Sequence, residues 1–254
     1  MDPEPDPGVS PAPDFDQPVG VTDAARHVGC GEHELVSFVG GGGKTTLLHA
    51  LAHGLPGTRI ATTTTKMSSA ESGDLRTLIG ASDGEIAAAA AKGPVLAWRS
   101  VSGGKGVGLD PSRCNALFGR VDHVIVEADG ARSMPFKAPG PFEPRVPSST
   151  TIMVSVIGAD ALGRVIADQC HRPLRVAALA GCGPYGRLAP EAAATVLLHP
   201  RGQRAALPDG GRFVIAITKV DAANIGFVRT LMAEVARLEP AILAIPIARF
   251  AGTR

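Results

Sequence analysis

Short apolar runs recur along the chain, and most are followed by a loop rich in glycine or threonine and then by a helical stretch. The runs predict strands at residues 35–39, 59–62, 95–98, 124–127, 152–157, 213–218 and 242–245. The helices expected from the same pattern span residues 22–28, 44–55, 84–92, 190–198 and 225–238. Strands that are apolar throughout and alternate with helices are typical of a parallel sheet with both faces covered. The sequence therefore predicts an α/β fold with a mostly parallel sheet, whose ligands bind beyond the carboxyl ends of the strands.

The loop after the first predicted strand carries a glycine run that leads into a helix. The chain there is Gly40-Gly41-Gly42-Gly43-Lys44-Thr45-Thr46, and all of these residues are candidates for nucleotide binding. Glycines let several N–H groups converge on one anion, and the helix that follows directs its positive dipole end to the same point. Lys44 would neutralise the β- and γ-phosphates, and the Thr45 hydroxyl would join a Mg²⁺ shell. A linker is the alternative for any glycine run, but this position favours a phosphate-binding P-loop.

One position departs from the standard P-loop, which has a glycine six residues before its lysine. Phe38 stands there, so we expect a loop that is altered or shortened at its start and intact at its Gly-Lys-Thr end. The expected architecture is a P-loop NTPase-like three-layer fold, with residues 19–254 as a single nucleotide-binding domain. Residues 1–18 alternate proline and aspartate and predict a disordered tail. Residues 130–150 and 199–211 are rich in proline and glycine and predict long loops.

Two acids, Glu127 and Asp129, flank Ala128 at the end of the apolar run 124–127. This is the form of a Walker B strand, whose terminal carboxylate holds Mg²⁺ directly or through water. One acid could hold the metal while the other positions water or a nucleophile, and the sequence leaves the assignment open. The alternative is an ordinary solvated turn. The expected catalytic residues are Lys44, Glu127 and Asp129, and the expected metal ligands are Thr45, Glu127 and Asp129.

Threonines also end the second predicted strand, where Thr64 and Thr65 precede Lys66. Hydroxyls at the carboxyl end of a strand can reach Mg²⁺ or a γ-phosphate, and a lysine can meet an anion. These residues are therefore candidates for a switch-like role in nucleotide binding. The alternative is that threonine is present because it suits strands.

Three stretches of the chain together resemble the YqeC family, which comprises accessory proteins of selenium-dependent molybdenum hydroxylases. They are residues 39–46 with 62–67, residues 126–131 with 135–139, and residues 143–147. The resemblance implies nucleotide binding coupled to maturation of an enzyme that contains selenium and molybdenum. Its partners would be a molybdenum hydroxylase or the proteins that handle its cofactor. By position, Lys137, Pro139, Glu143 and Pro144 fall in motifs of that family and could contact substrate or partner.

A possible base-recognition element follows the strand expected at 213–218. Thr218-Lys219-Val220-Asp221 fits the Asn/Thr-Lys-x-Asp element of guanine-specific P-loop proteins, in which the Asp accepts hydrogen bonds from guanine. Thr218 replaces the commoner asparagine, and a four-residue match arises readily by chance. Thr218, Lys219 and Asp221 are nevertheless candidate nucleotide-binding residues, with GTP favoured over ATP.

Composition narrows the function further. The formal net charge is +1 and only 4% of residues are aromatic, so nothing indicates a nucleic-acid partner. The four cysteines lack zinc-site spacing, no apolar run is long enough for a membrane span, and a cytoplasmic protein with reduced thiols is expected. The favoured function is a Mg²⁺-dependent, nucleotide-hydrolysing accessory protein using GTP or ATP. A small-molecule kinase and a nucleotide sensor without turnover are the alternatives.

Overall fold

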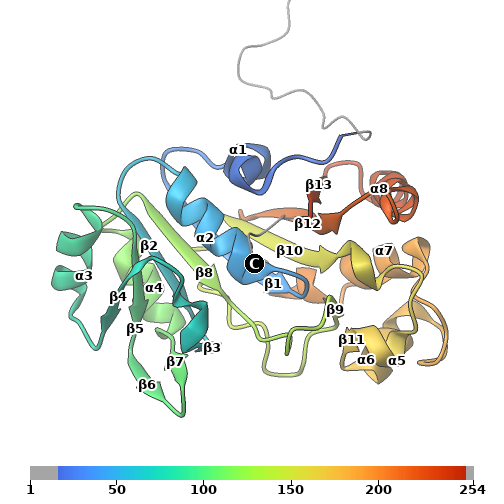
Figure 1. The fold of residues 1–254 in the computed structure, drawn as a ribbon, viewed down its shortest axis with the longest axis horizontal. Helices are drawn as coiled ribbons and strands as arrows, with labels where there is room; N and C mark the ends of the chain where they lie inside the picture. Colours follow the sequence, from blue (N-terminus) through green and yellow to red (C-terminus); the bar gives the residue numbers. More distant parts are fainter. Residues whose placement is uncertain (1–16, 250–254) are drawn as a thin grey trace, which may run out of the picture.

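Eight parallel strands form the central sheet of the computed structural model, which describes residues 17–249 (Figure 1). Neighbouring strands pair in parallel throughout the sheet. Their spatial order is β13 (Leu243–Ala248), β12 (Arg212–Val220), β10 (Ile152–Gly158), β1 (Glu34–Gly40), β8 (His123–Glu127), β2 (Arg59–Thr63), β5 (Val95–Trp98) and β4 (Arg76–Ile79). The α/β class and the parallel sheet predicted from the sequence are confirmed.

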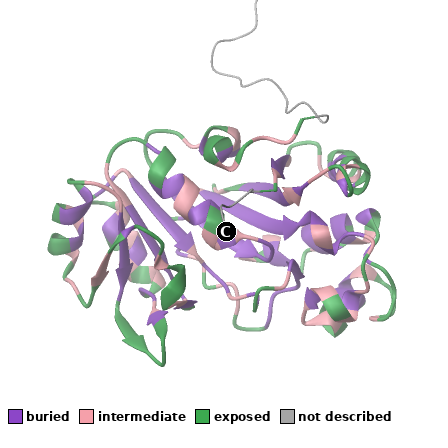
Figure 2. Cartoon of the chain, in the orientation of Figure 1, coloured by how far each residue is buried: buried purple, intermediate pink, exposed green. Residues whose placement is uncertain are grey.

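The sheet separates two hydrophobic cores, so the molecule has three layers. Alternate residues of β1 point to opposite faces, with Leu35 and Val39 in one core and Val36 and Phe38 in the other. One face is covered by α1 (Ala24–Val28) and α2 (Lys44–Gly54). The other is covered by α3 (Asp83–Ala90), α4 (Pro111–Phe118), α6 (Pro173–Ala180), α7 (Pro190–Leu198) and α8 (Ile225–Leu238). The strands between these layers are almost wholly buried, except the edge strand β4 (Figure 2).

Every strand and helix expected from the sequence is present, although some bounds differ. The helix expected at 22–28 divides into η1 (Val21–Asp23) and α1. The helix expected at 84–92 begins one residue earlier, because a capping box fixes its start. The Ser82 side chain accepts from the Glu85 amide, and the Glu85 carboxylate accepts from the Ser82 amide. The structure adds β4, α4, α6 and the short α5 (Ile166–Gln169), none of which the hydrophobic pattern indicated.

Two small sheets carry segments to the rim of the central one. The three-stranded sheet of β3 (Lys66–Ser68), β7 (Lys105–Val107) and β6 (Ser100–Ser102) is antiparallel. The other pairs β9 (Phe136–Lys137) with β11 (Cys170–His171), so the expected loop 130–150 contains a short strand. Three 3₁₀ turns complete the described chain: η2 (Ser69–Ser72), η3 (Ala159–Ala161) and η4 (Gln203–Ala206).

The described chain begins close to the far edge of the sheet. The Val19 amide donates at 2.9 Å to the carbonyl of Pro246, which lies in the edge strand β13. Residues 1–16 of the predicted tail lie outside the described residues. Within the described part, no helix is both long enough and apolar enough to cross a bilayer.

Candidate functional site

The glycine run forms a tight loop between β1 and α2 that larger residues would not fit. Gly40, Gly42 and Gly43 have φ of 96°, 85° and 116°, a region that residues with a Cβ rarely adopt. A Cβ on Gly40 would lie 2.3 Å from the Val156 carbonyl oxygen, and one on Gly42 would lie 2.2 Å from the Gly158 nitrogen. The loop therefore packs backbone against backbone on strand β10.

Helix α2 opens directly from this loop with no side-chain cap. Gly43 is the N-cap residue, so no side chain satisfies the free N–H groups of the first turn. Uncapped N–H groups and the helix dipole both favour an anion at this point. The geometry is that of an anion-binding loop followed by a helix N-terminus.

Lys44 folds back under the loop between two carboxylates. Its Nζ donates to the Gly40 carbonyl at 2.7 Å and lies 3.3 Å from Asp129 Oδ1 and 3.5 Å from Glu127 Oε1. Burial acts to lower the pKa of Lys44, but the fields of Asp129 and Glu127 outweigh it and raise that pKa. The lysine therefore stays charged beside the loop.

Glu127 ends strand β8 at the edge of a cavity. The Thr45 hydroxyl, in the first turn of α2, donates to Glu127 Oε2 at 2.9 Å. Burial is the largest influence on Glu127 and raises its pKa, although Lys44 and Thr45 act in the opposite direction. The hydroxyl and the carboxylate form a pair of hard oxygen donors, the type that Mg²⁺ prefers.

Asp129 has surroundings unlike those of Glu127. It is fully buried, accepts a hydrogen bond from the Gly40 amide at 3.0 Å, and pairs with Lys137 Nζ at 3.0 Å. Its carboxylate therefore lies behind the loop rather than in the cavity. Asp129 was expected as a metal ligand, and the structure places its carboxylate between the loop and two lysines, outside the lining of the cavity.

Lys137 extends this buried ionic network away from the loop. The side chain of Lys137 is completely buried, and its Nζ lies 2.9 Å from Glu143 Oε2, which also accepts from Arg172 at 2.9 Å. Burial acts to raise the pKa of Glu143, but bonds from Lys137 and Arg172 outweigh it and lower that pKa. Lys137 and Glu143 thus stabilise the segment after β8, and Glu143 also lines a separate hollow of about 350 Å³ together with Pro139 and Pro144.

A cavity of about 510 Å³ opens in front of the loop and is rich in basic side chains. The residues expected from the sequence that line it are Gly42, Gly43, Lys44, Thr45, Thr46, Lys66, Glu127 and Lys219. The expected residues that do not line it are Gly40, Gly41, Thr64, Asp129, Thr218 and Asp221. The structure therefore gathers the helix start, the end of β8 and the end of β12 around one space.

Thr64 and Thr65, which follow β2, do not line this cavity. Thr64 is almost fully buried and donates to the Arg145 carbonyl at 2.8 Å, while the Thr65 hydroxyl lies 3.1 Å from that of Thr63. Lys66 alone of the switch candidates is exposed and reaches the cavity.

Two basic residues that line the cavity, Lys105 and Arg132, were not indicated by the sequence pattern. Within residues 17–249, Lys66, Lys105 and Arg132 make no ion pair, so their charges are available to a ligand. Arg132 could have been suspected from its place just after the acidic strand end. Lys105 reaches the site only because β7 pairs with β3, where it lies opposite Ser68.

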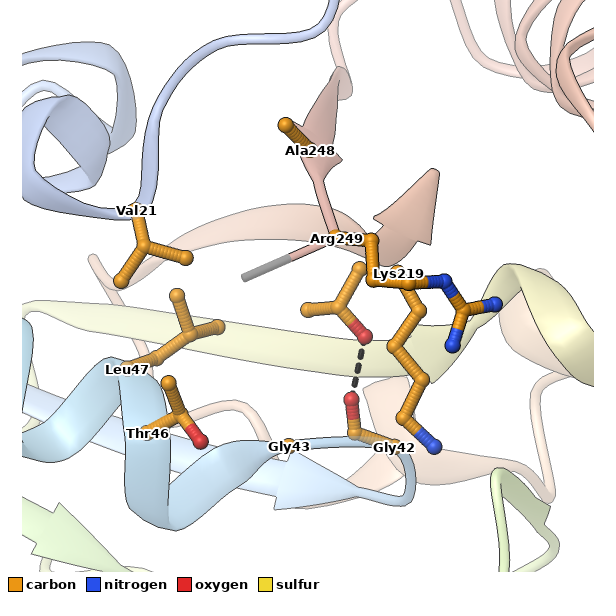
Figure 3. Close-up of a pocket in the computed structure, with 9 residues that line it drawn as sticks. Val21, Gly42, Gly43, Thr46, Leu47, Lys219, Ala248 and Arg249 are labelled. Atoms are coloured by element: carbon orange, nitrogen blue, oxygen red, sulfur yellow. Dashed lines mark hydrogen bonds between the residues drawn. The ribbon is translucent and has the colours of Figure 1, made fainter. Parts of the chain in front are cut away.

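A second hollow, of about 260 Å³, lies on the other side of the loop (Figure 3). Val21, Thr46 and Leu47 form one side of it, and Lys219 and Arg249 form another. The Thr218 hydroxyl donates to the Gly42 carbonyl and lies 3.2 Å from the Ile157 carbonyl oxygen, which fixes the loop to β12.

Asp221 does not face either of these spaces. Its Oδ2 accepts from Arg249 Nε at 2.8 Å and its Oδ1 from the Ala223 amide at 3.0 Å. The bond from Arg249 is the main reason that the pKa of Asp221 is lowered. Asp221 lines a separate hollow of about 270 Å³ beyond Arg249, so recognition of a base by this carboxylate requires Arg249 to move.

These features define an α/β protein with a tight glycine loop and an uncapped helix start at the carboxyl end of a parallel sheet. Residues 36–174, more than half of the chain, match the family described as YqeC protein, and the chain belongs to this family. It is 31% identical over 194 residues, 73% of this chain and 75% of the relative, to "Uncharacterized protein YqeC" of Escherichia coli (strain K12). No solved structure matches the chain significantly.

Proposed function

We propose that this chain is a P-loop NTPase-like protein that binds a nucleoside triphosphate with Mg²⁺ and hydrolyses it. The observation that carries the proposal is the Thr45–Glu127 hydrogen bond of 2.9 Å beside an uncapped helix start and a charged Lys44. A lysine, a hydroxyl and a carboxylate around converging N–H groups are the groups needed to hold phosphates and a divalent cation.

The phosphates would lie over the first turn of α2, in the cavity of about 510 Å³. The amides after Gly43 would donate to phosphate oxygens, and Lys44 would exchange its bond to the Gly40 carbonyl for one to a phosphate. Asp129 would act as a positioning residue, since it holds both the Gly40 amide and the Lys44 ammonium.

Thr45 and Glu127 are the residues that would hold Mg²⁺. Both are oxygen donors, they already lie within hydrogen-bond distance, and both line the cavity, so they fit this cation. Bound Mg²⁺ would neutralise the charge that develops on the phosphates. Lys44 would add a second positive charge from the opposite side of the Glu127 carboxylate.

The nucleoside would occupy the hollow of about 260 Å³. Gly42, Gly43 and Thr46 line both this hollow and the phosphate site. Lys219 borders both spaces, so its stem can lie along the base. We propose GTP as the preferred nucleotide, with Asp221 accepting from guanine once Arg249 releases it.

The family resemblance supports a proposal for the biological setting. We propose a cytoplasmic accessory role in maturation of selenium-dependent molybdenum hydroxylases, with the hydroxylase or its cofactor-handling proteins as partners. Nucleotide hydrolysis would then control when the protein binds and releases its partner.

A small-molecule kinase is the second candidate, because the cavity has basic side chains in addition to Lys44. Lys66, Lys105 and Arg132 lie around it without an ion pair to any described residue. They would suit an anionic acceptor facing the γ-phosphate.

Nucleotide profiling with product analysis separates these functions. GTP and ATP are incubated with Mg²⁺ and the protein, with and without the small-molecule fraction of a cell extract. Release of inorganic phosphate supports hydrolysis, and transfer of the γ-phosphate to a small molecule supports the kinase. Tight binding without either product indicates a nucleotide sensor, and absence of binding contradicts the proposal.

A further inference from the structure

Two histidines and an aspartate form a cluster on the solvent side of α2, away from the proposed nucleotide site. His49 and His53 are one turn apart on the helix and therefore share a face. Asp74 follows η2, and one ligand atom from each of the three residues lies within 4.8 Å of the others. His53 Nε2 and Asp74 Oδ1 are 3.0 Å apart.

The distances between these ligand atoms lie on either side of the distance that neighbouring ligands of a small metal ion have. Zinc holds nitrogen and oxygen ligands at about 2.0–2.2 Å, which puts neighbouring ligand atoms of a tetrahedral site roughly 3.4 Å apart. The side chains of His53 and Asp74 are 46% and 80% exposed. Both can therefore move to the separation that the ion requires, and the ion can enter from solvent.

His49 already has the support that metal-bound histidines usually have. Its Nε2 lies 2.9 Å from the Glu71 carbonyl oxygen, and in the tautomer that donates this bond Nδ1 keeps its lone pair. The turn is also shaped around this ring, because a Cβ on Gly73 would lie 2.7 Å from His49 Cε1. A backbone partner on the second ring nitrogen orients the ligand and is independent of the His53–Asp74 contact.

We propose that His49, His53 and Asp74 bind a divalent transition-metal ion of the zinc class, with water completing the coordination. Two imidazoles and a carboxylate suit Zn²⁺, Co²⁺ or Ni²⁺, whereas Mg²⁺ selects oxygen ligands. The ion joins α2 to the segment after β3. Glu71 in that segment lines the cavity that also contains Lys44 and Thr45, so metal binding fixes one wall of the candidate site.

The test is calorimetric titration of Zn²⁺ into untagged, EDTA-dialysed full-length protein, without Mg²⁺ or nucleotide. The wild-type protein binds one equivalent, and His53→Ala and His49→Gln each weaken binding at least about tenfold, as expected when a ligand is lost. His27→Ala removes a partly exposed histidine of α1 outside the cluster and is the matched control, with unchanged affinity.

Co²⁺ spectra check the ligand type, because a site of nitrogen and oxygen ligands lacks the strong near-ultraviolet band of a thiolate–cobalt bond. The proposal is overturned if wild type binds no stoichiometric Zn²⁺, if both cluster variants bind it as tightly as wild type, or if a thiolate band shows that a cysteine holds the ion. Since no nucleotide is present, each of these outcomes leaves the proposed nucleotide site untouched.

Discussion

Glu127 and Asp129 are two residues apart on the same strand end but have different physical environments. Glu127 borders the cavity and bonds to Thr45, whereas Asp129 is fully buried between Lys44 and Lys137. Removing one partner of a buried ion pair is costly, because the remaining charge stays desolvated. The two acids therefore have separable roles, one toward a metal and one toward the loop.

Neutral isosteres distinguish these roles. We expect Asp129→Asn to lower the free energy of unfolding by about 3 kcal/mol, since Lys137 and Lys44 lose a buried counter-charge. Glu127→Gln should keep most of the stability and nucleotide binding but lose Mg²⁺-dependent turnover. Urea unfolding and phosphate release measure the two effects. Equal stability of both variants would show that Asp129 does not hold the loop.

In the proposed GTP site, Arg249 would compete with guanine for the Asp221 carboxylate. If guanine replaces Arg249 on this carboxylate, GTP should bind at least about tenfold tighter than ATP, because a carboxylate left without a donor is costly. Asp221→Asn should move the preference from GTP towards XTP and leave phosphate binding unchanged. Competition binding with the three nucleotides measures the preference. An unchanged preference in the variant would limit Asp221 to its bond with Arg249.

At the scale of elements, the glycine loop tolerates little change. Gly42 has φ of 85° and its missing Cβ would collide with β10. Gly42→Ala should therefore destabilise the protein by several kcal/mol (roughly 1–3 for the backbone strain alone) and abolish triphosphate binding.

Gly84 is the matched control for this substitution. It lies in α3, and a Cβ there would meet nothing within 4 Å, so Gly84→Ala should raise stability by up to about 1 kcal/mol. Thermal unfolding of both variants measures the contrast. A Gly42→Ala protein with wild-type stability and binding would mean that the loop can take another conformation.

The sequence predicted the elements whose signal is local and missed those whose signal is not. Strand β1 is buried along its whole length and appears as an apolar run, but the edge strand β4 is half exposed and has no such run. Helix α4 has a weak signal because only Cys114 and Leu117 of its eight residues are buried.

The candidate site divides in the same way. Lys44 and Thr45 adjoin the glycine run in the sequence, and Glu127 ends a strand next to β1, so their proximity follows from parallel pairing. Burial of Asp129 and the approach of Lys105 depend on loop packing and on pairing of β3 with β7. No local sequence pattern predicts the burial of Asp129 or the position of Lys105.

For the whole molecule, the proposed ligand would connect elements that are distant in the chain. The cavity and the adjoining hollow are lined by residues from α2, β8, β12 and the end of β13. A ligand that binds only the folded state at 100 times its Kd adds about 2.7 kcal/mol of stability. MgGTP should then raise Tm by roughly 5–11 °C for a domain of this size, whereas Mg²⁺ alone should not.

Calorimetric titration of MgGTP into wild type and Lys44→Ala tests the central claim most directly. Lys137 still pairs with Asp129 in this variant, so the fold should persist, which circular dichroism can verify. A charge-assisted bond contributes about 1.5–3 kcal/mol, so Lys44→Ala should weaken binding by ~10- to 100-fold. Lys92→Ala, an exposed lysine just beyond α3, should bind as wild type does. Absence of binding to wild type, or equal affinity in folded Lys44→Ala, would contradict a nucleotide site at this loop.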